Sequence, residues 1–282
     1  MEQITQVFSP HYAPLYDGFY QDKDYAAEIA ILLALYGRFA EGALPNSLID
    51  LAVGTGKHAE HLLAAGIRVY ANDISAEMIS VAKERLGRFQ SNPPIFSCGP
   101  METLRLAGNA KADCAAAFFT ALGYLVSPES LAGFFANLRE NLRPGGYFFC
   151  DVWNGRQMIK NYAPQRVKQA QVAGYLVERV SLTSEQADRN ALRVEFIFTV
   201  KDPEGKKIVT TFSETHLVRY FSPAELSTLA WAYGFEVLAC TPFGEESTLA
   251  DCWNFSLFAR SRAKKISFIH STAGSSETSR TP

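Results

Sequence analysis

Residues 48–58, LIDLAVGTGKH, combine residue types that could bind a cofactor. A short apolar run leads into Asp50, then Gly54 and Gly56 follow two residues apart, and a helix-like segment begins near Lys57. Two glycines in a strand-to-helix turn let the backbone approach a ligand with no Cβ in the way. The free amides of the turn and of the helix N-terminus favour a negatively charged or electron-rich ligand group.

A second acid, Asp73, follows Gly54 at the sequence spacing that is typical of a residue binding the ribose of a cofactor. Asp73 ends the next apolar run, and a carboxylate at that strand end can accept two hydrogen bonds from ribose hydroxyls. The pair indicates a nucleoside-bearing cofactor. Gly54-x-Gly56-x-x-Ala59 also satisfies a dinucleotide fingerprint, so NAD is an alternative. Three features argue against NAD: the aromatic segment ahead of the motif, Asp50 before the turn, and two strand-like runs near the C-terminal end.

The elements that must position these residues follow from a regular alternation of apolar runs and amphipathic helices. After a helix over 24–40, strands are predicted at 48–52, 67–71, 95–98, 113–119 and 147–152, separated by helices at 57–65, 75–86 and from 127. This alternation predicts a parallel sheet with helices on both faces. A helix that begins at the capping box of Ser222, and strands at 235–239 and 253–259, predict a terminal hairpin on the sheet edge.

The alternation stops after Trp153. Between about 170 and 220, apolar and polar residues alternate at period two around the turn Asp202-Pro203-Glu204-Gly205, which predicts antiparallel strands. We therefore divide the chain into an N-terminal aromatic segment and helix (1–46), a core (47–160 and 221–261), a β insert (161–220) and a tail (262–282). Residues 1–22 are predicted to be irregular, and the Ser/Thr-rich tail to be disordered.

Composition limits the class of protein. The 282 residues are 48% hydrophobic and carry a net charge of −2, with neither a basic stripe for nucleic acid nor a polybasic cluster for a membrane. The five cysteines form no CxxC pair, which predicts reduced thiols and a cytoplasmic protein. No signal peptide and no membrane span are expected. His58 and His61 have no further ligand at metal-binding spacing, so we predict solvated helix residues and no metal.

Three stretches in order resemble the class I S-adenosylmethionine (SAM)-dependent methyltransferases: residues 48–56, residues 72–78 (NDISAEM) and residues 142–146 (LRPGG). A narrower resemblance, to the nucleotide-sugar N,N-dimethyltransferases, covers LYDGFY at 15–20, KDYAAE at 23–28, EFIFTV at 195–200 and THL at 215–217. The glycine N-methyltransferases share parts of these. The resemblance implies SAM as cofactor and an α/β, Rossmann-like sheet of seven mostly parallel strands with helices on both faces, plus a small antiparallel β insert.

The same resemblance implies which residues hold the cofactor. Asp50 would order the glycine turn, and Asp73 would hold the ribose. Pro100 is a departure, because the family usually has an aspartate there that binds the adenine amino group, and proline cannot accept that bond. The set implied for SAM is Tyr16, Lys23, Asp50, Ala52, Gly54, Gly56, Asp73, Ile74, Met78, Pro100, Met101 and Phe118.

The chemistry needs a neutral nucleophile in line with an already activated methyl group, in a site that excludes water. An amine must first lose its proton, for which Tyr20 is the first catalytic candidate and His216 the second. Tyr20 could instead be only a packed aromatic, and His216 could simply be satisfied within the sheet. The residues expected at the acceptor are Tyr20, Phe119, Thr120, Asp151 and Trp153, with the N-terminal aromatics as a lid.

The sequence thus predicts a SAM-dependent methyltransferase for the amine of a small molecule, with a nucleotide-linked amino sugar as the favoured acceptor. Neither nucleic acid nor a membrane is expected as a partner, and a homodimer is compatible with the pattern. The alternatives are methylation of another small amine or a hydroxyl, as in glycine N-methyltransferases or O-methyltransferases, an NAD-dependent oxidoreductase, and a SAM-binding protein without catalysis, which Pro100 would favour.

Overall fold

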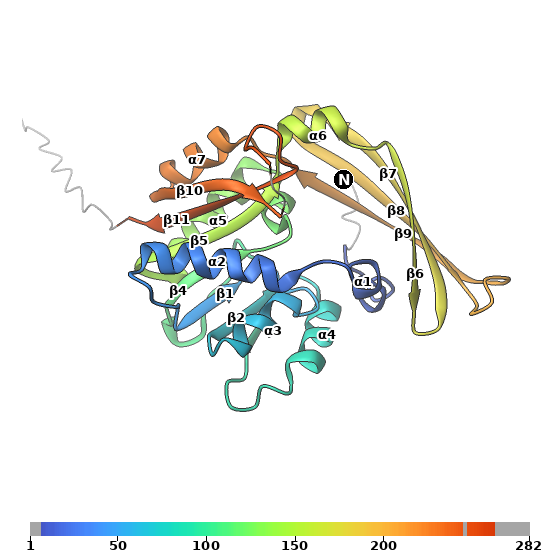
Figure 1. The fold of residues 1–282 in the computed structure, drawn as a ribbon, viewed down its shortest axis with the longest axis horizontal. Helices are drawn as coiled ribbons and strands as arrows, with labels where there is room; N and C mark the ends of the chain where they lie inside the picture. Colours follow the sequence, from blue (N-terminus) through green and yellow to red (C-terminus); the bar gives the residue numbers. More distant parts are fainter. Residues whose placement is uncertain (1–6, 245–246, 263–282) are drawn as a thin grey trace, which may run out of the picture.

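The computed structural model describes residues 7–244 and 247–262, whose strands form two sheets (Figure 1). The strands, in chain order, are β1 Ser47–Asp50, β2 Arg68–Asp73, β3 Ile95–Cys98, β4 Ala112–Ala117, β5 Leu142–Trp153, β6 Gln165–Val172, β7 Tyr175–Gln186, β8 Ala191–Lys201, β9 Ile208–Arg219, β10 Phe235–Phe243 and β11 Asn254–Ser261. The larger sheet has the order β10-β11-β5-β4-β1-β2-β3, and the smaller one β6-β7-β8-β9.

The helices connect and cover these strands. They are α1 Ala13–Phe19, α2 Tyr25–Phe39, α3 Lys57–Ala64, α4 Ala76–Leu86, α5 Pro128–Asn141, α6 Gly155–Asn161 and α7 Pro223–Ala232, with short 3-10 helices η1 Ala107–Asn109, η2 Ala121–Tyr124 and η3 Ala187–Arg189. Side chains cap several helix N-termini as the sequence predicts: Ser75 accepts the amide of Met78, and Ser222 forms a capping box with Glu225.

The seven-stranded sheet confirms the predicted α/β fold. β3, β2, β1, β4 and β5 are parallel neighbours, while β11 and β10 add an antiparallel hairpin beside β5. Alternate residues along each strand serve two different cores. Ile49 and Phe148 pack against α5 and α7 on one face, and Leu48 and Phe149 pack under α2, α3 and α4 on the other. The helices therefore cover both faces (Figure 1).

The insert is a four-stranded antiparallel sheet that stands beside the larger sheet (Figure 1). The predicted hairpin around Asp202–Gly205 is present, with β8 paired to β9 from Ala191 to Lys201. The sheet is larger than predicted, because β6 already begins at Gln165. α6, which the sequence analysis missed, precedes it.

The prediction that residues 1–22 are irregular is wrong for Ala13–Phe19, which form α1. A seven-residue helix shows too few turns for a readable periodicity and depends on tertiary packing. Here Tyr12 and Phe19 are buried against Val177 and Phe198 of the insert. The predicted tail lies outside the described residues from 263 onward. No helix within the described ranges is long and apolar enough to cross a membrane.

Candidate active site

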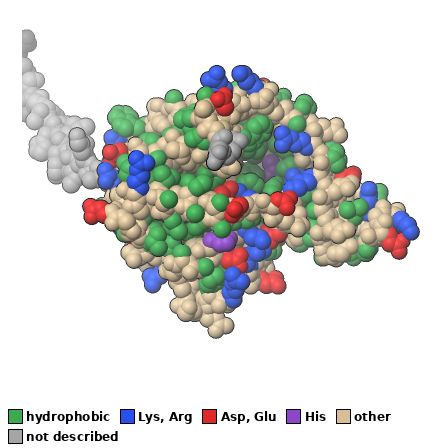
Figure 2. Space-filling view, in the orientation of Figure 1, with side chains coloured by type: hydrophobic (Ala, Val, Ile, Leu, Met, Phe, Trp, Pro, Cys, Tyr) green, Lys and Arg blue, Asp and Glu red, His purple; other side chains and the backbone are tan. Residues whose placement is uncertain are grey.

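A cavity of about 1260 Å³ lies where the carboxyl ends of the parallel strands, the N-terminal aromatic segment and the four-stranded sheet meet. In the space-filling view it is the hollow in which a histidine is visible, with Lys and Arg side chains beside it (Figure 2). Ligands of open α/β sheets bind at this edge. The cavity is larger than the roughly 300–1,000 Å³ of most small-molecule sites, so it has room for two molecules.

The glycine turn and Asp73 form one end of the cavity. The Gly54 amide donates to Asp73 Oδ2 at 2.8 Å, and the Ser75 amide donates to Oδ1 at 2.9 Å. Burial raises the pKa of Asp73 above its ordinary value, and these amides oppose the rise. Gly54 has φ +54°, and a Cβ built on it would meet nothing within 4 Å, so the turn leaves open space beside the carboxylate.

Gly56 has a different role from the one expected. It also has positive φ, at +86°, but its added Cβ would lie 3.2 Å from Leu86 and 3.3 Å from Ala82 of α4. The missing side chain therefore lets α4 pack closely against the turn, and Gly56 lies behind the cavity wall. Asn72 completes the support, because its side-chain amide donates to the carbonyls of Leu51 and Gly99.

Asp50 does not order the turn in the way the resemblance implied. Neither of its carboxylate oxygens has a hydrogen-bond partner of good geometry among the described residues, although the Ala52 amide lies close enough to lower the pKa. Asp73 holds the Gly54 amide instead. Burial nevertheless dominates and raises the pKa of Asp50 to about 7.

Most of the other residues expected at the cofactor line this end of the cavity. Met78 is buried, whereas Ile74 is 60% exposed and free to cover a ligand. The Met101 carbonyl accepts the side-chain amide of Asn137, which fixes the loop after β3. The predicted cofactor residues found in the lining are Tyr16, Ala52, Gly54, Asp73, Ile74, Met78, Pro100, Met101 and Phe118.

Lys23 forms an ion pair and does not line the cavity. Its ammonium pairs with Glu28, lies 4.2 Å from the centre of the Phe119 ring, and is absent from the cavity lining of the described chain. Glu28 also bonds His58 Nε2 at 2.7 Å. Burial opposes ionisation of Glu28, but His58 and Lys23 together lower its pKa. Lys57, at the start of α3, is the cation that lines the cavity here.

His58 is not the solvated residue that the sequence analysis predicted. Its ring is buried and stacks on Phe118 at 4.3 Å and 11°. His61 is half-buried one turn later. Among the residues described, no group of three or more His, Cys, Asp or Glu side chains is placed to hold a metal ion.

Asp151 shapes the loop after β4 instead of facing the acceptor. It is fully buried, and its carboxylate accepts the amides of Phe119 at 2.6 Å and Thr120 at 3.1 Å, with Asn254 as a third donor at 3.1 Å. Phe119 and Thr120 have φ of +56° and +61°, a conformation that costs non-glycine residues about 1–3 kcal/mol each. Asp151 thus holds two strained residues in the cavity wall, while Trp153 lines the cavity as predicted.

Tyr20 faces the cavity from the end of α1. Its hydroxyl accepts a hydrogen bond from Arg179 Nη1 at 3.1 Å, and its ring meets Phe119 edge-on at 5.0 Å. Arg179 itself is 9% exposed, lies over the ring of Phe196, and has no partner for its Nε among the described residues. A buried arginine with an unused donor beside a cavity suits an anionic ligand group.

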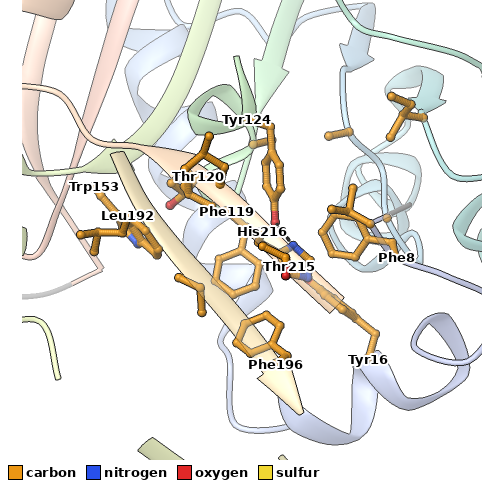
Figure 3. Close-up of a pocket in the computed structure, with 18 of the residues that line it drawn as sticks. Phe8, Tyr16, Phe119, Thr120, Tyr124, Trp153, Leu192, Phe196, Thr215 and His216 are labelled. Atoms are coloured by element: carbon orange, nitrogen blue, oxygen red, sulfur yellow. Dashed lines mark hydrogen bonds between the residues drawn. The ribbon is translucent and has the colours of Figure 1, made fainter. Parts of the chain in front are cut away.

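His216 lies in the cavity wall on β9 and belongs to a chain of polar groups that the sequence analysis missed. Its Nδ1 is 2.9 Å from the Tyr124 hydroxyl (Figure 3). Its Nε2 is 3.4 Å from Glu214 Oε2, a contact between the two groups without hydrogen-bond geometry. Glu214 also accepts the amides of Phe8 and Ser9. Tyr124 lies in a 3-10 turn with no periodic pattern, so only the tertiary fold brings it to His216.

The other end of the cavity belongs to the insert and is rich in arginine. The basic residues in the lining there are Arg166, Arg179, Arg189 and Arg193, with Asp188 as the acid among them. Single arginines on three strands and on η3 give no sequence signal until the fold brings them together.

These features fit SAM. The open side of Gly54 leaves the cradle that a Cβ would fill, Asp73 has lone pairs left for hydroxyl donors, and Met78 offers an apolar surface.

The comparisons with known proteins agree. A model of the family described as "Methyltransferase domain" matches residues 48–146. The dTDP-3-amino-3,4,6-trideoxy-alpha-D-glucopyranose N,N-dimethyltransferase of Streptomyces venezuelae is 31% identical over 238 residues, which cover 82% of this chain and 92% of that protein. The dTDP-3-amino-3,6-dideoxy-alpha-D-glucopyranose N,N-dimethyltransferase of Streptomyces fradiae is 28% identical over 82% of this chain and 86% of its own length.

Solved structures give the same result. The crystal structure of Streptomyces venezuelae DesVI superposes with a TM-score of 0.69 at 29% identity and covers 89% of this chain and 98% of that one. SAM-bound CalS10, an amino pentose methyltransferase from Micromonospora echinaspora, has a TM-score of 0.67 at 22% identity over 91% and 98% of the two chains, which shows the shared fold. The chain therefore belongs to the Rossmann-like SAM-dependent methyltransferases, in the group that includes the nucleotide-sugar N,N-dimethyltransferases.

Proposed function

We propose that this enzyme methylates the amine of an amino sugar carried on a nucleotide. The relatives named above act on dTDP-linked amino sugars. The observation that carries the proposal is a cavity whose two ends differ chemically. A glycine turn with Asp73 lies at one end, and the buried Arg179 lies at the other with three exposed arginines of the insert, Arg166, Arg189 and Arg193. A nucleoside diphosphate supplies the anion that such arginines bind.

At the cofactor end, Asp73 would bind the ribose hydroxyls, and the turn at Ala52 and Gly54 would lie along the methionine part. When bound, SAM supplies a methyl group on a sulfonium, which needs no further activation. Ile74 and Met78 would cover the adenosine, with Pro100 and Met101 beside the adenine. We assign the carboxylate of SAM to Tyr16 and Lys57, because Lys23 is already paired with Glu28. Phe118, which also lines the cavity, stays among the residues that we propose for the cofactor.

At the acceptor end, the aromatic side chains would hold the sugar while the arginines bind its anionic carrier. Tyr20, Thr120 and Trp153 line the cavity and would contact the sugar. Asp151 would act indirectly, through the Phe119–Thr120 loop that it holds. A free small amine such as glycine would leave the arginine-lined part of the cavity empty. We keep a cytoplasmic location and a homodimer as part of this proposal.

The test is a panel of acceptors incubated with SAM and read by mass. A nucleotide-linked amino sugar should gain one or two methyl groups, and the same sugar with a hydroxyl in place of the amine should gain none. The free amino sugar should react more slowly, because it lacks the anion. Methylation of glycine or of the hydroxyl sugar in preference to the amine would show that the proposed acceptor is wrong.

A further inference from the structure

Three polar side chains form a chain that starts in the cavity wall at Tyr124 and His216 and ends at the buried Glu214. Glu214 and His216 lie on the same face of β9 and are 2% and 1% exposed. Glu214 Oε2 faces His216 Nε2 at 3.4 Å without hydrogen-bond geometry, and the Tyr124 hydroxyl is hydrogen-bonded to His216 Nδ1 at 2.9 Å (Figure 3). Hydroxyl, imidazole and carboxylate stand in the order that a proton relay needs, with the hydroxyl next to the cavity.

The carboxylate end of this chain stays ionised. Burial alone would raise the pKa of Glu214, but the neighbouring His216 ring and the amides of Ser9 and Phe8 lower it below its ordinary value. A fixed negative charge beside Nε2 favours the tautomer with a proton on Nε2 and a free lone pair on Nδ1. In that tautomer, the Tyr124 hydroxyl donates to Nδ1 and keeps its own lone pairs for another donor.

Tyr124 cannot serve as a base by itself. Burial, with Tyr20, Glu214 and Asp73 as further causes, raises its pKa well above the ordinary value of a phenol, so a free phenolate does not form near neutral pH. The hydroxyl can only receive a proton while it passes its own to His216. Tyr20 is less suited, because its oxygen already accepts a hydrogen bond from the Arg179 cation.

The chain lies close to the cofactor end. The Phe8 ring is 5.2 Å from that of His216 and 5.7 Å from that of Tyr124, and the Phe8 carbonyl accepts the hydroxyl of Ser75, two residues after Asp73. The Glu214 carboxylate holds the amides of Phe8 and Ser9 from the other side. The N-terminal segment therefore joins this chain to the loop that follows the ribose-binding strand.

We propose that Tyr124, His216 and Glu214 remove the proton from the acceptor amine before methyl transfer. The ammonium nitrogen gives its proton to the Tyr124 oxygen as the Tyr124 proton moves to His216 Nδ1. The products are a neutral amine with a free lone pair, an unchanged phenol, and an imidazolium facing the Glu214 carboxylate. His216 later releases the proton to solvent. Tyr124 is the catalytic residue, and the other two are positioning residues that act through it.

This inference rests on the proposed amine acceptor, and the pH profile of kcat/KM tests it. Tyr124→Phe should lower the rate near neutral pH by about 10²-fold or more, the size of a general-base contribution. The loss should shrink as pH rises to values at which the amine is neutral in solution. The titratable or charged groups around the relay are Glu214 from β9, Tyr12, Tyr16 and Tyr20 from the N-terminal segment, and Asp73; they are unchanged in the variant.

His216→Gln should show the same pH dependence. The double variant Tyr124→Phe/His216→Gln should be no slower than His216→Gln, because each substitution interrupts the same proton relay. Tyr175→Phe and His61→Gln, outside the cavity, are the matched controls. Binding without SAM gives a second readout. Tyr124→Phe should weaken binding of the amine acceptor by about three- to tenfold and leave the analogue with hydrogen in place of the amine unaffected.

The outcomes separate the two proposals. If the wild-type enzyme methylates no amine, the proposed function fails. If it does, but Tyr124→Phe is impaired by the same factor at every pH or not at all, the relay is wrong and the function stands. A Tyr124→Phe protein that does not fold shifts the decision to His216→Gln, judged by the same pH profile. Additive losses in the double variant would also overturn the relay.

Discussion

At the residue scale, three carboxylates in and behind the active site differ in the groups that they hold. Asp73 accepts two amides and faces the cavity, Asp151 accepts two amides and an asparagine behind it, and Asp50 has no well-formed bond among the described residues. The sequence placed all three at strand ends. Their partners depend on neighbouring strands, so their separate roles could not be read from the sequence.

Asp151→Asn should slow methyl transfer with little change in SAM affinity. The oxygen of the new asparagine side chain can accept from the backbone amide of Phe119 or of Thr120, while its NH₂ group faces the other amide. The amide left without an acceptor costs about 1–3 kcal/mol. The loop should then leave its positive-φ conformation. Denaturant unfolding, kcat and SAM calorimetry measure the three effects. Asp22→Asn on the exposed surface is the control, and unchanged kcat in Asp151→Asn would refute the positioning role.

Asp50→Asn tests the buried carboxyl through pH. Burial raises the pKa of Asp50 to about 7, so the folded chain holds a proton that the unfolded chain releases near pH 4. The free energy of unfolding therefore falls as pH rises through that window, and the Asp50→Asn substitution removes this slope. The stability advantage of wild type over Asp50→Asn should shrink by about 2–3 kcal/mol between about pH 5 and pH 8.

Denaturant titrations of both proteins at each pH give that difference directly. Asp151, whose pKa burial also raises to about 7, titrates in both proteins and cancels. A difference that stays constant with pH would mean that Asp50 is ionised in the folded state throughout.

At the scale of elements, the contact between α1 and β6 sets the position of the aromatic segment. A Cβ built on Gly18 of α1 would overlap Cγ2 of Val172 on β6. Gly18→Ala should therefore destabilise the protein by about 1–3 kcal/mol and slow methyl transfer, because Tyr16 and Tyr20 move with the helix. Denaturant unfolding and kcat/KM measure both effects.

Val172→Ala in the Gly18→Ala background should restore much of the loss, because it removes the clashing methyl groups. Gly133→Ala is the matched control. Gly133 lies in α5, and a Cβ built on it would be 3.8 Å from Glu102, an ordinary contact distance. The Gly133→Ala substitution should therefore be neutral or stabilise the protein by up to about 1 kcal/mol. If Gly18→Ala behaves like Gly133→Ala, α1 is not held by this contact.

The elements of the core were predictable because local signals and the hydrophobic pattern agree there. Ser75 and Ser222 cap helices, and Gly66 ends α3 with φ +80°. α1 and the first half of the insert were missed or shortened. Seven residues give α1 no clear period, and β6 is an edge strand whose mostly exposed residues lack an alternating apolar pattern.

At the scale of the whole molecule, the two sheets create the site together. Neither the glycine turn nor the insert encloses a cavity by itself, and the N-terminal segment joins them through Ser75 and Glu214. Most of the residues that the motifs assigned to the cofactor line one cavity, and they lie close together in the sequence. The arginines and the Tyr124–His216–Glu214 chain come from distant segments, so only the folded chain shows that they meet.

The central claim is that the space beside Gly54 and Asp73 holds SAM, and calorimetric titration tests it most directly. SAM should bind the wild-type protein, and Asp73→Asn should weaken binding by about 10- to 100-fold, the size of a lost charged hydrogen bond. Asp22→Asn should bind SAM like wild type, and NAD should give no binding heat. Binding of NAD in place of SAM, or SAM affinity unchanged by Asp73→Asn, would contradict the account.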